Sequence, residues 1–145
     1  MDFDPNNNIV QLCAHGMELE GMGQLAKAAG IFNEAWDQAS NDFEKCIAAH
    51  YLARHQETAS GKLKWDQLAL HHALNTNDQS IKPTLASLYL NIGKCYEDLH
   101  DPENAKKHYQ LAVSYTAFLP HDGYGAMIKR GIESALTRMN VRLPQ

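Results

Sequence analysis

The strongest structural signal lies in two stretches, LCAHGMEL at residues 12–19 and YLNIGKCY at residues 89–96. In each stretch a large residue is followed four positions later by a glycine, and three positions after the glycine by a second large residue. The match continues downstream at identical offsets, with Ala28, Phe32 and Ala35 after the first stretch and Ala105, Tyr109 and Ala112 after the second. Spacings of three and four residues are typical of helices that bury one face, so the repeat predicts two similar helical hairpins.

The same spacing extends over most of the chain, and no stretch alternates with the period of a strand for more than a few residues. We therefore predict an all-α protein. The turn signals divide it into helices at about 9–20, 24–38, 41–56, 64–74, 83–99, 102–118 and 123–139. Three of these have an expected capping residue, namely Asn41 with Glu44, Asp101 before Pro102, and Asp122, and residues 58–62 are expected to form a loop.

Composition indicates a single globular domain that covers residues 1–145. Hydrophobic residues make up 44% of the 145 residues and charged residues 21%, which are values of a folded chain. The formal charge of -4 disfavours nucleic acid as a partner, and the absence of a long apolar run disfavours a membrane. The start MDFDPNNN is acidic and polar, unlike a signal peptide, so we expect a cytoplasmic protein. Three widely spaced cysteines indicate reduced, packed thiols.

The repeated pattern resembles the tetratricopeptide repeat (TPR), a helix pair of about 34 residues. The strings AHYLARHQ at residues 49–56 and SLYLNIG at residues 87–93 look like those of small stand-alone bacterial TPR proteins, a group without an assigned activity. The resemblance implies an α-α superhelix of three hairpins, at about 8–39, 41–75 and 83–117, and a C-terminal capping helix at about 122–139. The middle hairpin matches poorly and has small residues at Cys46, Ala49, Ala53, Ala69 and Ala73.

In a TPR array the first helix of each hairpin lines a concave groove, and this implies five contact residues: Tyr51, Arg54, His55, Asn91 and Lys94. Their aromatic, guanidinium and amide groups suit a peptide carboxylate or an acidic side chain. The expected function is a non-enzymatic adaptor or scaffold that binds a protein or peptide segment. The chain departs from the two-carboxylate clamp of chaperone-binding TPR proteins, because Cys13, Met17 and Ser87 stand at clamp positions. The alternative interpretation is that Tyr51 and Arg54 pack within the protein and the groove is merely solvated.

Two other classes of function stay open. The first is self-association, in which a homodimer forms a structural subunit of a larger complex. The second is a cryptic catalytic or metal site, for which Cys46 and His50 share a helix face and His72 is a third candidate ligand. The segment GMGQLA at residues 21–26 fits a dinucleotide fingerprint but lacks the strand that the fingerprint requires. We expect packed histidines, no metal, no cofactor, no catalytic residues and no enzymatic activity.

Overall fold

The computed structural model describes residues 3–141, and every regular element in that part of the chain is a helix. The predicted all-α class is therefore confirmed. The helices form two compact units, residues 3–80 and residues 81–141, which are described separately. Among the described residues, no helix combines the length and the apolar character that crossing a bilayer requires.

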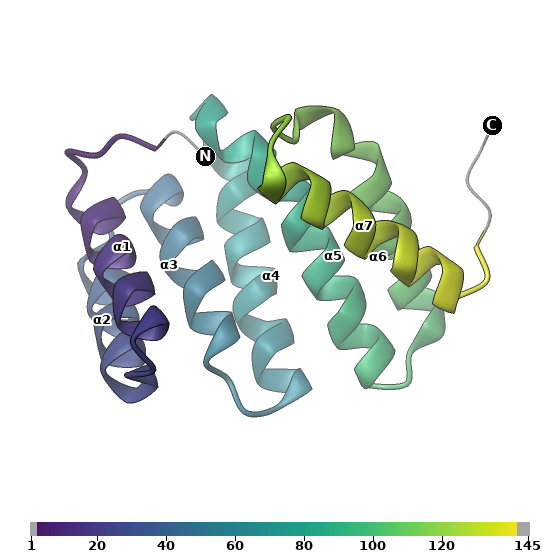
Figure 1. Ribbon diagram of the computed structural model, residues 1–145, viewed down its shortest axis with the longest axis horizontal. Coiled ribbons are helices and arrows are strands. Elements are labelled where there is room, and N and C mark those ends of the chain that lie inside the picture. The colour runs from purple at the N-terminus through teal and green to yellow at the C-terminus, as the bar shows by residue number, and fades with distance from the viewer. Residues whose placement is uncertain (1–2, 142–145) are drawn as a thin grey trace. The chain divides into compact units, whose positions relative to one another are not determined.

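The N-terminal unit contains four helices in two hairpins. Its helices are α1 (Asn8–Gly21), α2 (Leu25–Gln38), α3 (Asp42–Arg54) and α4 (Ala59–Asn75), and successive helices run in opposite directions (Figure 1). Helix α1 packs on α2 and α3 packs on α4, while α3 also packs on both helices of the first hairpin. The fully buried side chains of Phe32, Ile47 and Leu52 form the centre of this unit.

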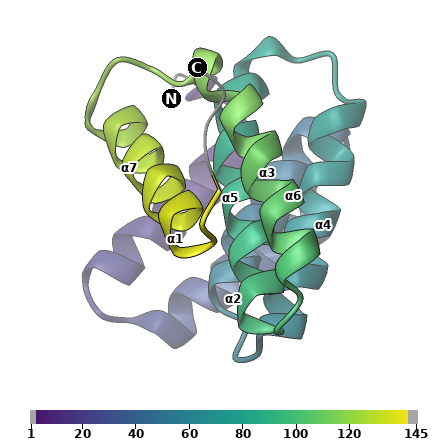
Figure 2. The ribbon, with the colours of Figure 1, turned by 90° about the vertical axis from the view of Figure 1, so that its right-hand side faces the viewer.

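The C-terminal unit contains one hairpin and one additional helix. Helix α5 (Lys82–Asp98) packs on α6 (Pro102–Ser114), and α7 (Gly123–Arg138) lies against both (Figure 2). Two short 3-10 helices, η1 (Gln79–Ile81) and η2 (Thr116–Phe118), precede α5 and follow α6. Helix α7 buries Ile128, Ile132 and Leu136 and exposes Lys129 and Arg130. One face of α7 is thus apolar and the other polar, as expected of a helix that ends a hydrophobic core.

The two hairpins that match in sequence have the same internal packing. A Cβ atom added to Gly16 of α1 would lie 2.4 Å from the ring of Phe32 on α2. A Cβ atom added to Gly93 of α5 would lie 2.6 Å from the ring of Tyr109 on α6. Real Cβ atoms do not approach rings so closely, so each glycine is required for the contact between its helices. The two hairpins that were predicted to be similar therefore share this contact.

The turns of these hairpins are also alike. Gly23 has φ +76° and His100, at the equivalent position of the second hairpin, has φ +62°. In both turns the next residue donates its N–H to the carbonyl five positions before it, at 2.9 Å. This bond satisfies a carbonyl left free at the end of the first helix. The repeat therefore extends from the sequence to the backbone conformation.

Helix starts follow the predicted caps, with one correction. The side chains of Asn41, Asp101 and Asp122 each accept a hydrogen bond from a backbone N–H in the first turn of the following helix. The predicted loop at residues 58–62 is wrong, because α4 already begins at Ala59. The Oγ1 atom of Thr58 accepts from the N–H of Gly61 at 3.0 Å, and this cap starts the helix within a segment of weak helix formers.

Candidate functional site

The five predicted contact residues lie in different units. Tyr51 and Arg54 belong to α3 and His55 follows it directly, whereas Asn91 and Lys94 belong to α5 of the C-terminal unit. The structure brings the first three together, with a partly exposed arginine and half-buried tyrosine and histidine. It also pairs Lys94 with Asp98, one turn later on α5, at 2.8 Å.

Arg54 and His55 both bind the carboxylate of Glu20, at the end of α1. The Arg54 Nη2 atom donates to Glu20 Oε1, and His55 Nε2 lies 2.8 Å from Glu20 Oε2. We call these three residues the Glu20 cluster. Two nitrogen-containing side chains thus bind one carboxylate. Binding of a carboxylate is the chemistry that the sequence predicts for these residues, but here the carboxylate belongs to the protein itself.

An aromatic stack supports the Glu20 cluster from the core side. The ring of Tyr51 stacks on Phe32 of α2 with a centroid distance of 5.0 Å and an interplanar angle of 7°. The Arg54 guanidinium lies over the Tyr51 ring, with its Cζ atom 4.7 Å from the centre of the ring. Phe32 is the residue that contacts Gly16. The repeated glycine and aromatic pair is therefore continuous with the predicted contact residues, and it limits the positions that Tyr51 and Arg54 can take.

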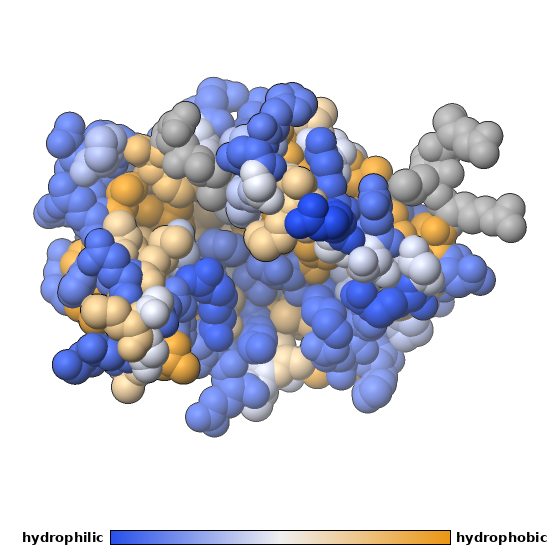
Figure 3. Space-filling model, viewed as in Figure 1, coloured by the Kyte–Doolittle hydropathy of each residue, from blue (hydrophilic) through white to orange (hydrophobic). Residues whose placement is uncertain are grey.

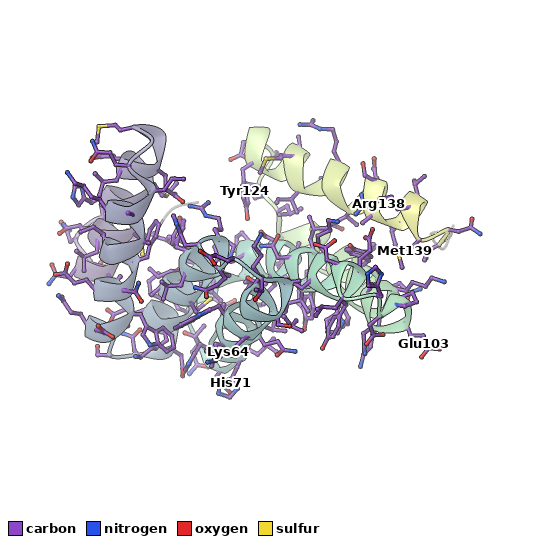
Figure 4. All side chains as sticks on the ribbon, turned by 90° about the horizontal axis from the view of Figure 1, so that it is seen from below. Lys64, His71, Glu103, Tyr124, Arg138 and Met139 are labelled. Atoms are coloured by element: carbon purple, nitrogen blue, oxygen red, sulfur yellow. The ribbon has the colours of Figure 1, made fainter. Side chains whose placement is uncertain are left out.

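The C-terminal unit contains an equivalent arrangement, the Glu97 cluster, formed by Glu97, Tyr109 and Arg138. Glu97 follows Gly93 by four positions, as Glu20 follows Gly16. Its carboxylate accepts from the Tyr109 hydroxyl at 2.6 Å and from Arg138 Nε and Nη2 at 3.1 and 3.2 Å. Arg138 lies at the end of α7 (Figure 4), as Arg54 lies at the end of α3. The hydrogen bonds from Arg138, together with the one from Tyr109, hold the pKa of Glu97 below its usual value.

Both clusters therefore join the first helix of a hairpin to the helix that packs on that hairpin. Sequence reasoning missed Glu20 and Glu97, although a signal was available. The two glutamates stand at the same position of the repeated pattern, and Glu20 precedes Arg54 by 34 residues, the approximate length of one TPR unit. A charge pair between adjacent hairpins would produce such a spacing.

The histidine and cysteine candidates for a metal site are buried or bound to other side chains of the protein. His72 Nδ1 lies 2.7 Å from Asp42 Oδ1, and its ring meets the edge of Trp36. Burial raises the pKa of the Cys46 thiol to about 12, so the metal-binding thiolate is disfavoured. Burial, with the nearby Arg54, lowers the pKa of His50 to about 4. Across residues 3–141, no three His, Cys, Asp or Glu side chains are grouped in a way that could hold a metal ion.

One acidic residue in α4 is almost completely buried. Asp66 is 3% exposed, and its Oδ1 atom has no hydrogen-bond partner among the described residues. Burial raises the pKa of Asp66 to about 7, against a smaller opposite effect of Lys62 one turn earlier. A charged carboxylate is costly in such buried surroundings, so the neutral acid is stabilised near neutral pH. Sequence reasoning also missed this residue, because an aspartate in a polar helix segment is ordinarily solvated.

Comparison with protein families, with curated proteins and with solved structures finds no match to this chain.

Proposed function

We propose that the protein is a non-enzymatic interaction scaffold of the TPR type, which binds a peptide or protein segment through the first helices of its hairpins. The observation that carries this proposal is the repeated hairpin, in which Gly16 with Phe32 and Gly93 with Tyr109 make the same contact. Arrays of helical hairpins expose extended surfaces and commonly act by binding other proteins. The three-hairpin superhelix and the cytoplasmic location remain part of the proposal.

The Glu20 cluster supports a carboxylate as the recognised group. Arg54 and His55 already bind one carboxylate, and the side chain of Arg54 is 44% exposed. Glu20 is only 21% exposed, and in this proposal a carboxylate of a partner binds the exposed part of the Arg54 side chain in competition with Glu20. Lys94 is half exposed in its pair with Asp98 and can exchange in the same way. In this proposal Tyr51 supplies an aromatic surface beside the guanidinium, and Asn91 supplies an amide on α5.

Affinity capture from a native cell extract tests this function. The wild-type protein is compared with a Tyr51→Ala, Lys94→Ala variant, and a Lys106→Ala, Lys107→Ala variant serves as the control for lost surface charge. Circular dichroism first establishes that each variant is folded. We expect a partner that the wild type and the control retain and that the Tyr51→Ala, Lys94→Ala variant loses.

Two other outcomes contradict the proposal in different ways. If all three proteins capture the same partner, the residues of α3 and α5 are not the binding surface. If none captures a partner and light scattering finds a dimer, the protein is a self-associating subunit rather than an adaptor.

A further inference from the structure

The two tryptophans of the chain lie together on the second helices of the N-terminal hairpins. Trp36 of α2 and Trp65 of α4 meet edge to face, with ring centroids 5.1 Å apart and an interplanar angle of 90°. Both residues are half-buried, so part of each remains accessible to solvent. Single apolar residues on a surface are common, and Figure 3 shows apolar surface over α1 as well. Two partly exposed indole rings in contact are instead typical of the centre of a protein interface.

Neighbouring side chains hold Trp36 in one orientation. The Nζ atom of Lys45 lies 4.1 Å from the centre of the Trp36 ring and donates a hydrogen bond to the Trp36 carbonyl oxygen at 3.0 Å. The ring of His72, which is itself bonded to Asp42, lies 6.1 Å from the same indole. An aromatic side chain that is already ordered loses little conformational entropy on binding, so these contacts favour the accessible part of Trp36 as an anchor.

An acidic and a basic residue flank the tryptophans on opposite helices. Asp37 follows Trp36 on α2 and Lys64 precedes Trp65 on α4, and both charged residues are exposed. Neither forms a hydrogen bond or an ion pair within residues 3–141. Figure 4 shows Lys64 on the same outer side of α4 as His71, seven positions later. We call Trp36, Asp37, Lys64 and Trp65 the tryptophan patch.

The tryptophan patch is complementary to a second copy of itself. Helices α2 and α4 run in the same direction, because successive helices of the unit alternate in direction (Figure 1). A two-fold axis parallel to these helices therefore places α2 of one copy opposite α4 of the other. The indole rings then meet at the centre, and Asp37 of each copy faces Lys64 of the other copy. A partner of uniform charge would satisfy only one of these two charged residues.

We propose that the tryptophan patch joins two copies of the chain in a symmetric dimer. The patch contains none of the residues proposed to contact a peptide, so each copy keeps those residues and the dimer is a bivalent scaffold. The bivalence rests on the proposed function, whereas dimerisation does not. Two binding surfaces in one particle increase the avidity for a partner that has two binding segments. Because the patch is small, we expect a dissociation constant in the micromolar range and a single chain in dilute solution.

A charge exchange between α2 and α4 tests the proposal. Light scattering measures the mass of the purified full chain over concentrations that span the micromolar range. The variants are Asp37→Lys, Lys64→Glu and the double variant with both substitutions. Lys106→Glu is the matched control, because Lys106 is also an exposed lysine but lies on α6. Circular dichroism establishes that each variant is folded.

We expect the wild type and Lys106→Glu to approach twice the mass of one chain as concentration rises. Each single substitution creates two like-charged contacts in the dimer and is expected to weaken dimerisation about tenfold or more. The double variant restores opposite charges between the copies and is expected to regain the wild-type affinity to within about threefold. Indole fluorescence provides a second measurement, because both tryptophans of the chain lie in the patch. Its emission is expected to change with concentration in the wild type but not in the single variants.

Three results would overturn the proposal. The first is a wild type that stays a single chain at every concentration, even if a cell extract yields a protein that Lys64→Glu fails to capture, since another protein would then occupy the patch. The second is a single variant that dimerises like the wild type, and the third is a double variant that does not recover. If dimerisation fails these tests while the extract still yields a partner lost on mutation of Tyr51 and Lys94, the scaffold function stands for the single chain.

Discussion

Buried Asp66 is expected to make the stability of the protein depend on pH in a direction opposite to that of most carboxylates. Its pKa is raised by burial from the usual 3.8 to about 7, so the folded state binds a proton more tightly than the unfolded state does. Between these two pH values the folded state holds more protons, and stability falls as pH rises. Each pH unit corresponds to about 1.4 kcal/mol, so the full loss is about 4 kcal/mol.

His50 is expected to produce the opposite dependence of stability on pH over an overlapping range. Its Nδ1 atom is buried without a hydrogen-bond partner among residues 3–141, and burial, with Arg54, lowers its pKa from 6.5 to about 4. Protonation is therefore disfavoured in the folded state, and stability falls as pH drops through this interval, by about 3 kcal/mol in total. Where the two intervals overlap, the contributions of Asp66 and His50 oppose each other. Their sum is nearly independent of pH there.

Replacing Asp66 with asparagine separates the two contributions. The free energy of unfolding of Asp66→Asn and wild type is measured by urea denaturation at several pH values from about 4 to about 7.5. The difference, variant minus wild type, is expected to rise by about 4 kcal/mol over this range, because only the wild type must ionise a buried acid. The cost of burying the amide is constant and leaves this slope unchanged. Asp37→Asn, at an exposed site on α2, serves as the control. A difference that does not change with pH would refute the reasoning.

Two further predictions concern the repeated hairpin. Gly16→Ala is expected to lower the free energy of unfolding by about 1–3 kcal/mol because its Cβ meets the ring of Phe32, whereas Gly30→Ala, at an exposed position with open space among the described residues, is expected to raise it by about 0.5–1 kcal/mol. Equal effects of the two alanines in chemical denaturation would contradict the packing. Glu97→Gln is expected to cost about 1 kcal/mol at neutral pH, because the bonds from Arg138 and Tyr109 lose a charged acceptor. This difference is expected to disappear as pH falls through the lowered pKa of Glu97, where the wild type is protonated too, and its persistence at low pH would exclude the charge as the cause.

Local patterns predicted most of the secondary structure. The caps Asn41, Asp101 and Asp122 depend on residues within one helical turn, so neighbouring letters of the sequence were sufficient. The segment after Thr58 was misread for the same reason, because Ser60 and Gly61 are weak helix formers and the contribution of the cap was not recognised. For the candidate site, the grouping of Tyr51, Arg54 and His55 followed from their spacing around the end of one helix.

The residues that bind Arg54 and His55 could not be predicted from local sequence patterns. The carboxylate between Arg54 and His55 comes from Glu20, on a helix that reaches α3 only through tertiary packing. The burial of Asp66 and the pairing of His72 with Asp42 likewise depend on which helix faces each side chain. The helical period in a sequence indicates which residues share one face of a helix, but it does not indicate which other helix packs against that face.

The amino-acid sequence was therefore sufficient for the helices and for the two similar hairpins, since both arise from regular spacings along the chain. Only the tertiary structure decided that Met17 stays exposed while Asp66 is buried, and that the carboxylate bound by Arg54 and His55 is that of Glu20. Burial and pairing are set by the packing of helices that are distant in sequence, and the energies of charged groups depend on those surroundings more than on the residue type.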